Sequence, residues 1–240
     1  MFDILPAIDL RGGRVVRLEQ GDFNRETVFS SDPVAVATAF ADAGARWLHV
    51  VDLDGARAGS PVHGDVIRRV VGAVGDRVSV EVAGGLRSVE TVSAALETGA
   101  SRVVVGTGAL REPGFARELI DTHGHDRIAI ALDVRAGRAV GDAWRTGAGG
   151  PTVDEALEQL WDEGIRIFEV TAIDRDGLLG GPDLPLYERL AALRLGSIIA
   201  SAGVASAADI DAVRRIGCTG AIIGRALYDG RLRLAEALEA

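Results

Sequence analysis

The segment LPAIDLRGGR at residues 5–14 is echoed by AIALDVRAGR at residues 129–138, about 124 positions further along the chain. Each copy is an apolar run that ends in one aspartate and is followed by Arg, a short glycine-containing stretch and Arg again. The similarity continues in the same order, since GTGAL at residues 106–110 corresponds to GRAL at residues 224–227. A chain whose halves match in order predicts a closed structure built from two similar units.

Eight apolar segments alternate with segments that carry helix signals. Most of the eight are continuous apolar runs, as expected for parallel strands that are buried on both faces. The expected strands are residues 4–8, 47–51, 78–82, 102–105, 128–132, 167–170, 197–200 and 221–223. Eight βα units predict an α/β fold of the (β/α)8 TIM-barrel type with a two-fold half-barrel repeat. An open doubly wound sheet is the alternative, but it does not naturally produce two matching halves.

We expect one barrel domain over residues 1–240, with half-barrels at about 1–123 and 124–240, because no composition shift or linker divides the chain. Capping residues mark several helix starts. Asp32 precedes a proline, Thr152 and Glu155 have the spacing of a capping box, and Ser88 and Ser206 are placed to cap helices after the third and seventh strands.

The composition excludes several function classes. A chain of 240 residues that is 48% hydrophobic is long enough to bury one large core. The net charge of -9 argues against a nucleic-acid surface, which needs clustered cations. All 26 basic residues are arginine, so catalysis through a lysine Schiff base is excluded.

The same composition favours a cytoplasmic protein with no membrane association. The single cysteine, Cys218, allows no internal disulfide, and no Cys/His spacing typical of a metal site occurs. No apolar run approaches the roughly 18 residues of a membrane span. The first residues enter a strand without the basic and apolar regions of a signal peptide.

Two aspartates, Asp9 and Asp133, end the first and the fifth expected strands. In a TIM barrel the active site forms at the C-terminal ends of the strands. Strands one and five lie opposite each other in a ring of eight, so the two carboxylates should face a common centre. A single aspartate there is also consistent with a loop cap or an ion pair, but its recurrence at matching places favours a catalytic pair.

Glycine-rich segments follow two adjacent strands in each half. Backbone N–H groups in such loops, close to helix starts, form sites for anions. The candidate phosphate ligands are Gly84, Gly85, Gly106 and Thr107 in the first half and Ser201, Gly203, Gly224 and Arg225 in the second. The two sites lie on opposite sides of the predicted barrel mouth. The expected ligand is therefore an elongated small molecule with a phosphate at each end.

Five motifs spread over the chain carry a family resemblance. They are LPAIDL at residues 5–10, VRLEQGDF at 16–23, HVVDLDGA at 49–56, GGLR at 84–87 and TAIDRDG at 171–177. Together they resemble the isomerase of the fourth step of histidine biosynthesis, and the resemblance runs the whole length. It implies a TIM barrel that converts a bisphosphate, phosphoribosylformimino-aminoimidazole-carboxamide ribotide, from its aminoaldose to its aminoketose form.

The resemblance also implies roles for individual residues. Asp9 resembles the general base and Asp133 the general acid of a cofactor-free Amadori rearrangement, while some family members use the carboxylate that matches Asp176 as the acid. Thr171 would hydrogen-bond the reacting centre. The implied substrate contacts are Arg17, His49, Arg87, Trp144 and Gly177. From its apolar strand alone, His49 is more typical of a core residue than of a substrate contact. No metal, cofactor or macromolecular partner is expected, and a monomer is expected.

Three alternatives remain open. One is a dual-substrate relative that also isomerises phosphoribosylanthranilate; its pattern has an arginine two residues before the tryptophan, where this chain has Asp142 before Trp144. The second is the cyclase subunit of the same pathway, whose pattern has a cysteine and a lysine where this chain has Ala7 and Arg17. The third is a non-catalytic barrel that binds phosphate without turnover.

Overall fold

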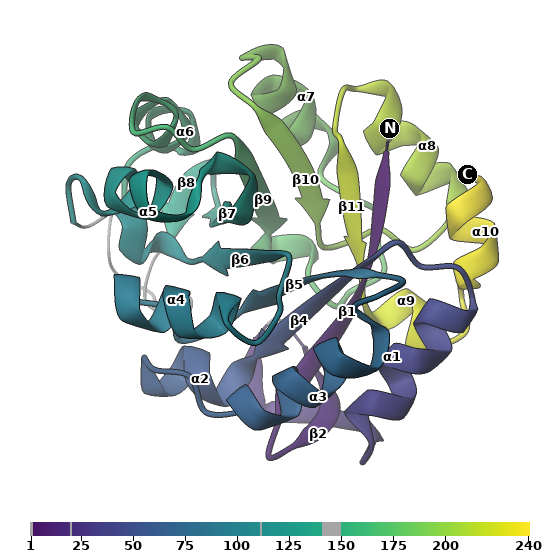
Figure 1. Ribbon diagram of the computed structural model, residues 1–240. Helices are drawn as coiled ribbons and strands as arrows, with labels where there is room; N and C mark the ends of the chain where they lie inside the picture. The colour runs from purple at the N-terminus through teal and green to yellow at the C-terminus, as the bar shows by residue number, and fades with distance from the viewer. Residues whose placement is uncertain (1, 20, 111, 141–149) are drawn as a thin grey trace.

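Eight parallel strands form a closed barrel in the computed structural model, which describes residues 2–19, 21–110, 112–140 and 150–240 (Figure 1). In ring order the barrel strands are β1 (Asp3–Arg11), β4 (Trp47–Asp52), β5 (Ser79–Ala83), β6 (Arg102–Val105), β7 (Ile128–Arg135), β9 (Ile167–Ala172), β10 (Ser197–Ser201) and β11 (Gly220–Ile223). Strand β1 pairs in parallel with β4 on one side and with β11 on the other, which closes the ring. The TIM-barrel prediction is confirmed, and the open sheet is excluded.

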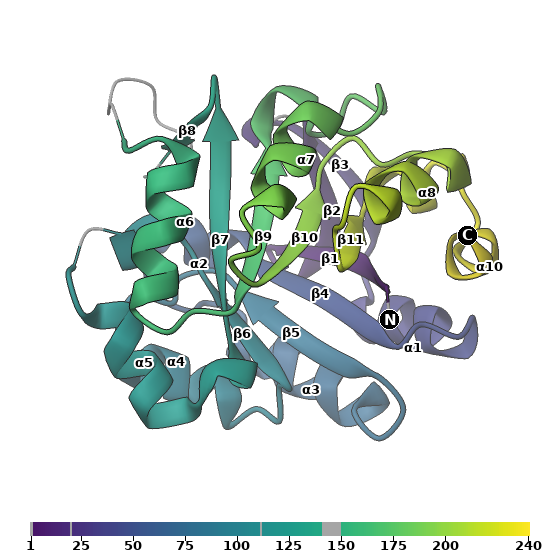
Figure 2. The ribbon, with the colours of Figure 1, turned by 90° about the horizontal axis from the view of Figure 1, so that it is seen from above.

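Helices surround the barrel on its outer face (Figures 1 and 2). The α-helices are α1 (Pro33–Asp42), α2 (Leu53–Ala58), α3 (Gly64–Val74), α4 (Val89–Leu96), α5 (Phe115–His123), α6 (Val153–Asp162), α7 (Leu184–Ala192), α8 (Ala207–Arg215), α9 (Arg225–Tyr228) and α10 (Leu234–Glu239). Short 3-10 helices are η1 (Thr107–Leu110), η2 (His125–Arg127) and η3 (Ile173–Arg175). Asp32, Ser88, Thr152 and Ser206 cap α1, α4, α6 and α8 through their side chains, as predicted.

Three further strands extend from the barrel as hairpins: β2 (Arg14–Glu19), β3 (Asp22–Ser30) and β8 (Arg138–Val140). Strand β1 turns back into β2 and strand β7 into β8 with the same register, because Asp9 pairs with Val16 and Asp133 pairs with Val140. Continuous apolar runs do not reveal these strands, because β8 is short, β3 is largely exposed, and Arg17 and Glu19 interrupt the apolar pattern of β2. The repeat nevertheless includes them, because the Arg-Gly-Gly-Arg and Arg-Ala-Gly-Arg segments form the two turns.

The main hydrophobic core lies between the barrel strands and the surrounding helices. Its largest fully buried side chains include Phe168, Leu48 and Leu132 from strands and Tyr187 and Leu157 from helices. Burial of both faces explains why the strand sequences are almost continuously apolar. Among the described helices, none combines the length and the apolar character needed to cross a membrane.

Candidate active site

A cavity of about 510 Å³ lies at the C-terminal ends of the barrel strands. Its wall includes Asp9 from β1, Asp133 from β7 and Thr171 from β9. Thr171 is the register partner of Asp133 on the neighbouring strand. The two predicted carboxylates, which come from opposite sides of the ring, therefore share one cavity with a hydroxyl group.

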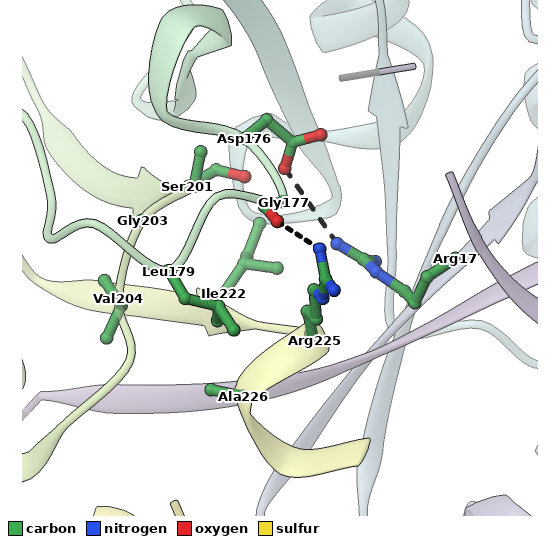
Figure 3. Close-up of a pocket in the computed structure, with 12 residues that line it drawn as sticks. Arg17, Asp176, Gly177, Leu179, Ser201, Gly203, Val204, Ile222, Arg225 and Ala226 are labelled. Carbon is green, nitrogen blue, oxygen red and sulfur yellow. Dashed lines mark hydrogen bonds and ion pairs between the residues drawn. The ribbon is translucent and has the colours of Figure 1, made fainter. Parts of the chain in front are cut away.

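Arg17, on the β2 strand of the first hairpin, lies between two carboxylates. Its Nη1 donates to Asp9 Oδ2 at 2.7 Å. On the other side, its Nη2 lies 4.0 Å from Asp176 Oδ1 (Figure 3). Burial by itself would lower the pKa of Arg17, but the charges of Asp9 and Asp176 raise it. The hairpin thus brings a permanent cation to the general-base candidate.

Asp176 follows η3 and lines both the main cavity and a smaller recess. Burial raises the pKa of its carboxyl group, and the negative charge of Asp9 adds to this increase, although Arg17 opposes it. A raised pKa keeps a carboxyl group protonated closer to neutral pH, which suits a proton donor.

The first-half phosphate candidates lie in the main cavity. Gly84 and Gly85 after β5 line it together with Gly106 after β6, and Arg87 lies in the same wall. Gly85 has a φ of +73°, and a Cβ there would come within 2.6 Å of the Ser60 carbonyl carbon. Only glycine allows this close approach of two backbone segments. Thr107 begins η1 in the adjacent loop.

The second-half candidates form a separate recess of about 30 Å³. Its lining includes all four predicted phosphate ligands of this half, Ser201, Gly203, Gly224 and Arg225. The predicted substrate contacts Gly177 and Arg17 also line it (Figure 3).

Two guanidinium groups occupy the neighbourhood of this recess. Arg225 Nη1 donates to the Gly177 carbonyl at 2.6 Å. A Cβ at Gly224 would lie 2.5 Å from Arg17 Cζ, so the Arg17 guanidinium group rests against the Gly224 backbone. Both arginine side chains therefore contribute to the wall of the recess.

A buried polar network beneath the cavity includes one predicted residue, His49, and three that the sequence analysis missed. These are Glu81 of β5, Arg102 of β6 and Glu169 of β9, and all three are almost completely inaccessible to solvent. A charged residue inside an otherwise apolar strand, as in SVEVA or IFEVTA, is the signal that would have found them, since such a charge needs a partner.

Three members of the network are close enough to suggest a metal site. Ligand atoms of His49, Glu81 and Glu169 lie within 4.8 Å of one another. Arg102, however, donates from Nε to Glu81 Oε2 at 2.9 Å and also contacts this oxygen through Nη2. One carboxylate of the group is thus already balanced by a guanidinium cation, so we interpret the cluster as a hydrogen-bonded network.

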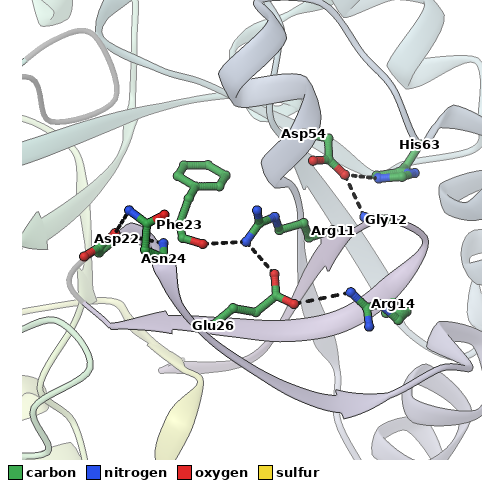
Figure 4. A network of polar contacts seen from close by, with 9 residues as sticks. All are labelled: Arg11, Gly12, Arg14, Asp22, Phe23, Asn24, Glu26, Asp54 and His63. Atoms are coloured by element: carbon green, nitrogen blue, oxygen red, sulfur yellow. Dashed lines mark hydrogen bonds and ion pairs between the residues drawn. The ribbon is translucent and has the colours of Figure 1, made fainter.

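The β2–β3 hairpin is attached to the barrel by its own polar contacts (Figure 4). Arg11 donates to the Phe23 carbonyl at 2.8 Å and pairs with Glu26 at 2.6 Å. Asp54 accepts from the Gly12 N–H and contacts His63 Nε2, both at 2.7 Å. These contacts hold the ring of Phe23 at the wall of the cavity.

Trp144, together with Asp142 and Arg145, lies outside the described residues. The other predicted catalytic and substrate-contact residues all line the main cavity or the recess. His49 is among them, with its ring at the cavity wall and 8% of the residue exposed.

The fold and the site together define a TIM barrel with opposed carboxylates in a cavity that is lined by glycine-rich loops from both halves. A family model described as "Histidine biosynthesis protein" matches residues 3–233. The chain belongs to this family, within its group of histidine-pathway isomerases. The resemblance stated from the five motifs is confirmed.

Similar proteins occur in several bacteria, each named 1-(5-phosphoribosyl)-5-((5-phosphoribosylamino)methylideneamino) imidazole-4-carboxamide isomerase. The protein of Thermomicrobium roseum is 48% identical over 231 residues, which cover 96% of this chain and 93% of the relative. That of Roseiflexus castenholzii is 45% identical, over 100% of this chain and 99% of the relative. That of Rhodospirillum rubrum is 43% identical, over 98% of this chain and 97% of the relative.

Proposed function

We propose that this chain converts phosphoribosylformimino-aminoimidazole-carboxamide ribotide from its aminoaldose to its aminoketose form. The observation that carries the proposal is the presence of Asp9 and Asp133 in one cavity, between two sets of anion-binding loops. The relatives' name describes a molecule with two phosphoribosyl groups, and two anion sites suit such a ligand. Membership of the isomerase group supports the same reaction.

In the proposed mechanism, a carboxylic acid donates a proton to the ring oxygen of the ribose, and the ring opens to an imine. Asp9 then removes the proton from C2′, which leaves an enolamine. Loss of the enol proton and protonation of C1′ give the ketone, so the reaction has no net loss or gain of atoms. General acid and base groups of this kind typically contribute on the order of 10² to 10⁴ in rate.

The acid is assigned to Asp133, which lies opposite the base at the matching place in the repeat. Asp176 is the second candidate, favoured by the specific observation that burial raises the pKa of its carboxyl group. The pH dependence of kcat in Asp133→Asn and Asp176→Asn separates the two. Removal of the acid abolishes the alkaline limb of the profile, whereas removal of the other carboxyl group leaves that limb in place.

The decisive experiment is a coupled assay of the purified chain on the bisphosphate and on phosphoribosylanthranilate. We expect the first reaction to dominate, because Asp142 stands where the dual-substrate pattern has an arginine. An acid at that place repels the anthranilate carboxylate, whereas a guanidinium group would bind it through two hydrogen bonds. Comparable kcat/KM values on the two substrates would support the dual-substrate alternative, and saturable binding without turnover would support the non-catalytic one.

We also propose that the chain acts as a cytoplasmic monomer without metal or organic cofactor. The expectation that no cofactor is needed rests on a site made of carboxylates, hydroxyl groups and candidate anion-binding loops. Activity should survive dialysis against a chelator, and the active species should elute from a sizing column at about the 25.1 kDa of one chain. Loss of activity that added metal restores would contradict the first expectation.

A further inference from the structure

Three adjacent barrel strands place a histidine, a glutamate and an arginine at one level. His49 of β4 is the register partner of Glu81 on β5, and Glu81 is the register partner of Arg102 on β6. His49 Nδ1 lies 2.6 Å from Glu81 Oε1, and Arg102 donates to the other carboxylate oxygen. Arg102 is itself held over the Trp47 ring, with Cζ 4.4 Å from the ring centroid.

The position of one hydrogen atom follows from these contacts. Burial alone would raise the pKa of Glu81, but the hydrogen bond from His49 and the charge of Arg102 hold it well below its usual range, so Glu81 is a carboxylate. A carboxylate only accepts hydrogen bonds, and therefore His49 Nδ1 carries a hydrogen and donates it. In the neutral imidazole ring Nε2 is then an acceptor.

Glu169 does not compete for this hydrogen atom. Its Oε2 lies 3.6 Å from His49 Nδ1, too far for a hydrogen bond, and its Oε1 has no hydrogen-bond partner among the described residues. Burial and the nearby charge of Glu81 raise the pKa of Glu169 well above its usual range. Glu169 therefore keeps its proton to higher pH than an ordinary glutamate, whereas Glu81 loses its proton more readily.

We propose that Glu81 is a positioning residue for the isomerisation, which acts through His49. By accepting from Nδ1, Glu81 fixes the ring so that Nε2 is left as a hydrogen-bond acceptor for a sugar hydroxyl group in the cavity. His49 lines that cavity while its Nδ1 end is buried against Glu81. The identity of the hydroxyl-bearing ligand rests on the proposed function, whereas the state of the ring does not.

Glu81→Gln provides a specific test because Arg102 can only donate hydrogen bonds. The glutamine must turn its carbonyl oxygen toward Arg102 and its NH₂ group toward His49. Nδ1 then has to accept, so the hydrogen moves to Nε2, and the ring no longer offers an acceptor for the hydrogen of the sugar hydroxyl group. We expect kcat/KM to fall about tenfold to a hundredfold, the range for leaving a buried polar group unsatisfied.

The state of the ring is read by ¹⁵N NMR of the imidazole nitrogens. The His49 signals are identified by their loss in His49→Gln, and circular dichroism verifies the fold of each variant. The expected spectrum shows hydrogen on Nδ1 in the wild type and on Nε2 in Glu81→Gln. Glu169→Gln is the matched control, since it changes the neutral carboxyl group beside the same ring and should leave the hydrogen on Nδ1.

A wild-type spectrum with hydrogen on Nε2, or on both ring nitrogens, would overturn the proposal, even if Glu81→Gln did not fold. An unchanged kcat/KM in a Glu81→Gln variant whose ring has switched would also overturn it, as would a variant whose ring stays in the wild-type state. A wild-type protein with hydrogen on Nδ1 but no turnover of the bisphosphate would instead contradict the proposed function. The two failures are thus distinguishable.

Discussion

In the first half of the barrel, the glycine-rich loops after β5 and β6 open into the cavity of about 510 Å³. In the second half, the loops after β10 and β11 line a recess of only about 30 Å³, and Arg17 and Arg225 form part of its wall. The backbones that carry these loops are equivalent in the repeat. A repeated scaffold thus provides two similar pairs of loops, of which one pair lines an open cavity and the other lines a small recess together with two arginine side chains.

The barrel interior shows the same divergence. His49 on β4 and Glu169 on β9 occupy equivalent places in the two halves. His49 is the register partner of Ala7 on β1, and Glu169 is the register partner of Ala131 on β7, the matching strand of the second half. Only the first half supplies the ionised pair of Glu81 and Arg102. The second half places Ile199 at the position of Glu81, and the pKa of Glu169 is raised well above its usual range by burial and by the charge of Glu81. Equivalent backbone places therefore carry chemically different groups with different partners.

The largest expected effect concerns the opposed aspartates. We predict that Asp9→Asn lowers kcat by about a hundredfold or more, on the scale of a lost general base, while the fold is retained. Asp133→Asn should cause a loss of similar size if the two halves contribute as a pair. Steady-state kcat at saturating bisphosphate measures both. Near-normal turnover of Asp9→Asn would remove this residue from the mechanism.

The second prediction compares the two buried glutamates through protein stability. Glu81→Gln leaves Arg102 without a charged partner and should lower the free energy of unfolding by about 3 kcal/mol or more, as for a broken buried ion pair. Glu169→Gln replaces a neutral acid by a neutral amide and should cost less than about 1 kcal/mol. Urea unfolding at neutral pH measures both values.

The contribution of Glu81 to the stability of the folded protein depends on pH. The pKa of Glu81 is lower in the folded than in the unfolded protein. Its ionised form therefore stabilises the folded protein above the unfolded-state pKa of 4.5, and this stabilisation disappears as the pH falls through the folded-state pKa. Wild type and Glu81→Gln should therefore converge in stability at low pH. A constant difference down to acidic pH would contradict the ionised state of Glu81.

The barrel could be predicted because its strands are buried on both faces. Continuous apolar runs such as IAIAL at residues 128–132 can be read without knowing their neighbours. The hairpin strands could not be found in this way. In β3, charged residues and Asn24 interrupt the pattern, and most of the strand is exposed. Its pairing depends on β2, which local sequence does not specify.

For the site, the ends of the strands were predictable and the interior was not. Asp9 and Asp133 follow directly from the repeat together with the rule that barrel ligands bind at strand ends. Arg17 came from the family motif, and its position between Asp9 and Asp176 depends on the hairpin fold. Glu81 was missed because its partners lie 32 and 21 residues away on neighbouring strands.

The third prediction tests whether the recess lined by Arg225 binds a phosphate group of the substrate. Arg225→Met removes a guanidinium group from the recess but keeps an apolar side chain of similar length. We expect KM for the bisphosphate to rise about tenfold, the cost of one charge-assisted hydrogen bond, with kcat within about threefold. The exposed Arg231 serves as the control, because Arg231→Met changes the same net charge away from the recess. Equal effects of the two variants would indicate general electrostatics instead of a phosphate site.

The smallest effect is expected at Asp176, where catalysis and stability oppose each other. The folded protein holds the Asp176 proton more tightly than the unfolded chain, since burial raises the pKa of this carboxyl group above 3.8. Stability from this group is therefore present at acidic pH and decreases as the pH rises through the folded pKa. Asp176→Asn removes the cost of burying an ionised carboxylate at neutral pH. It should therefore increase the free energy of unfolding by up to about 1 kcal/mol, as stabilising substitutions commonly do.

Thermal unfolding of Asp176→Asn between acidic and neutral pH tests this expectation, with Asp174→Asn as the control in the same segment. Asp174 has 70% of its side chain exposed, so its replacement should change the stability little. If Asp176→Asn is more stable and also slower in turnover, the second half keeps a destabilising carboxyl group because the reaction needs its proton. If Asp176→Asn is less stable, the attraction to Arg17 at 4.0 Å outweighs burial, and the argument for Asp176 as a proton donor fails.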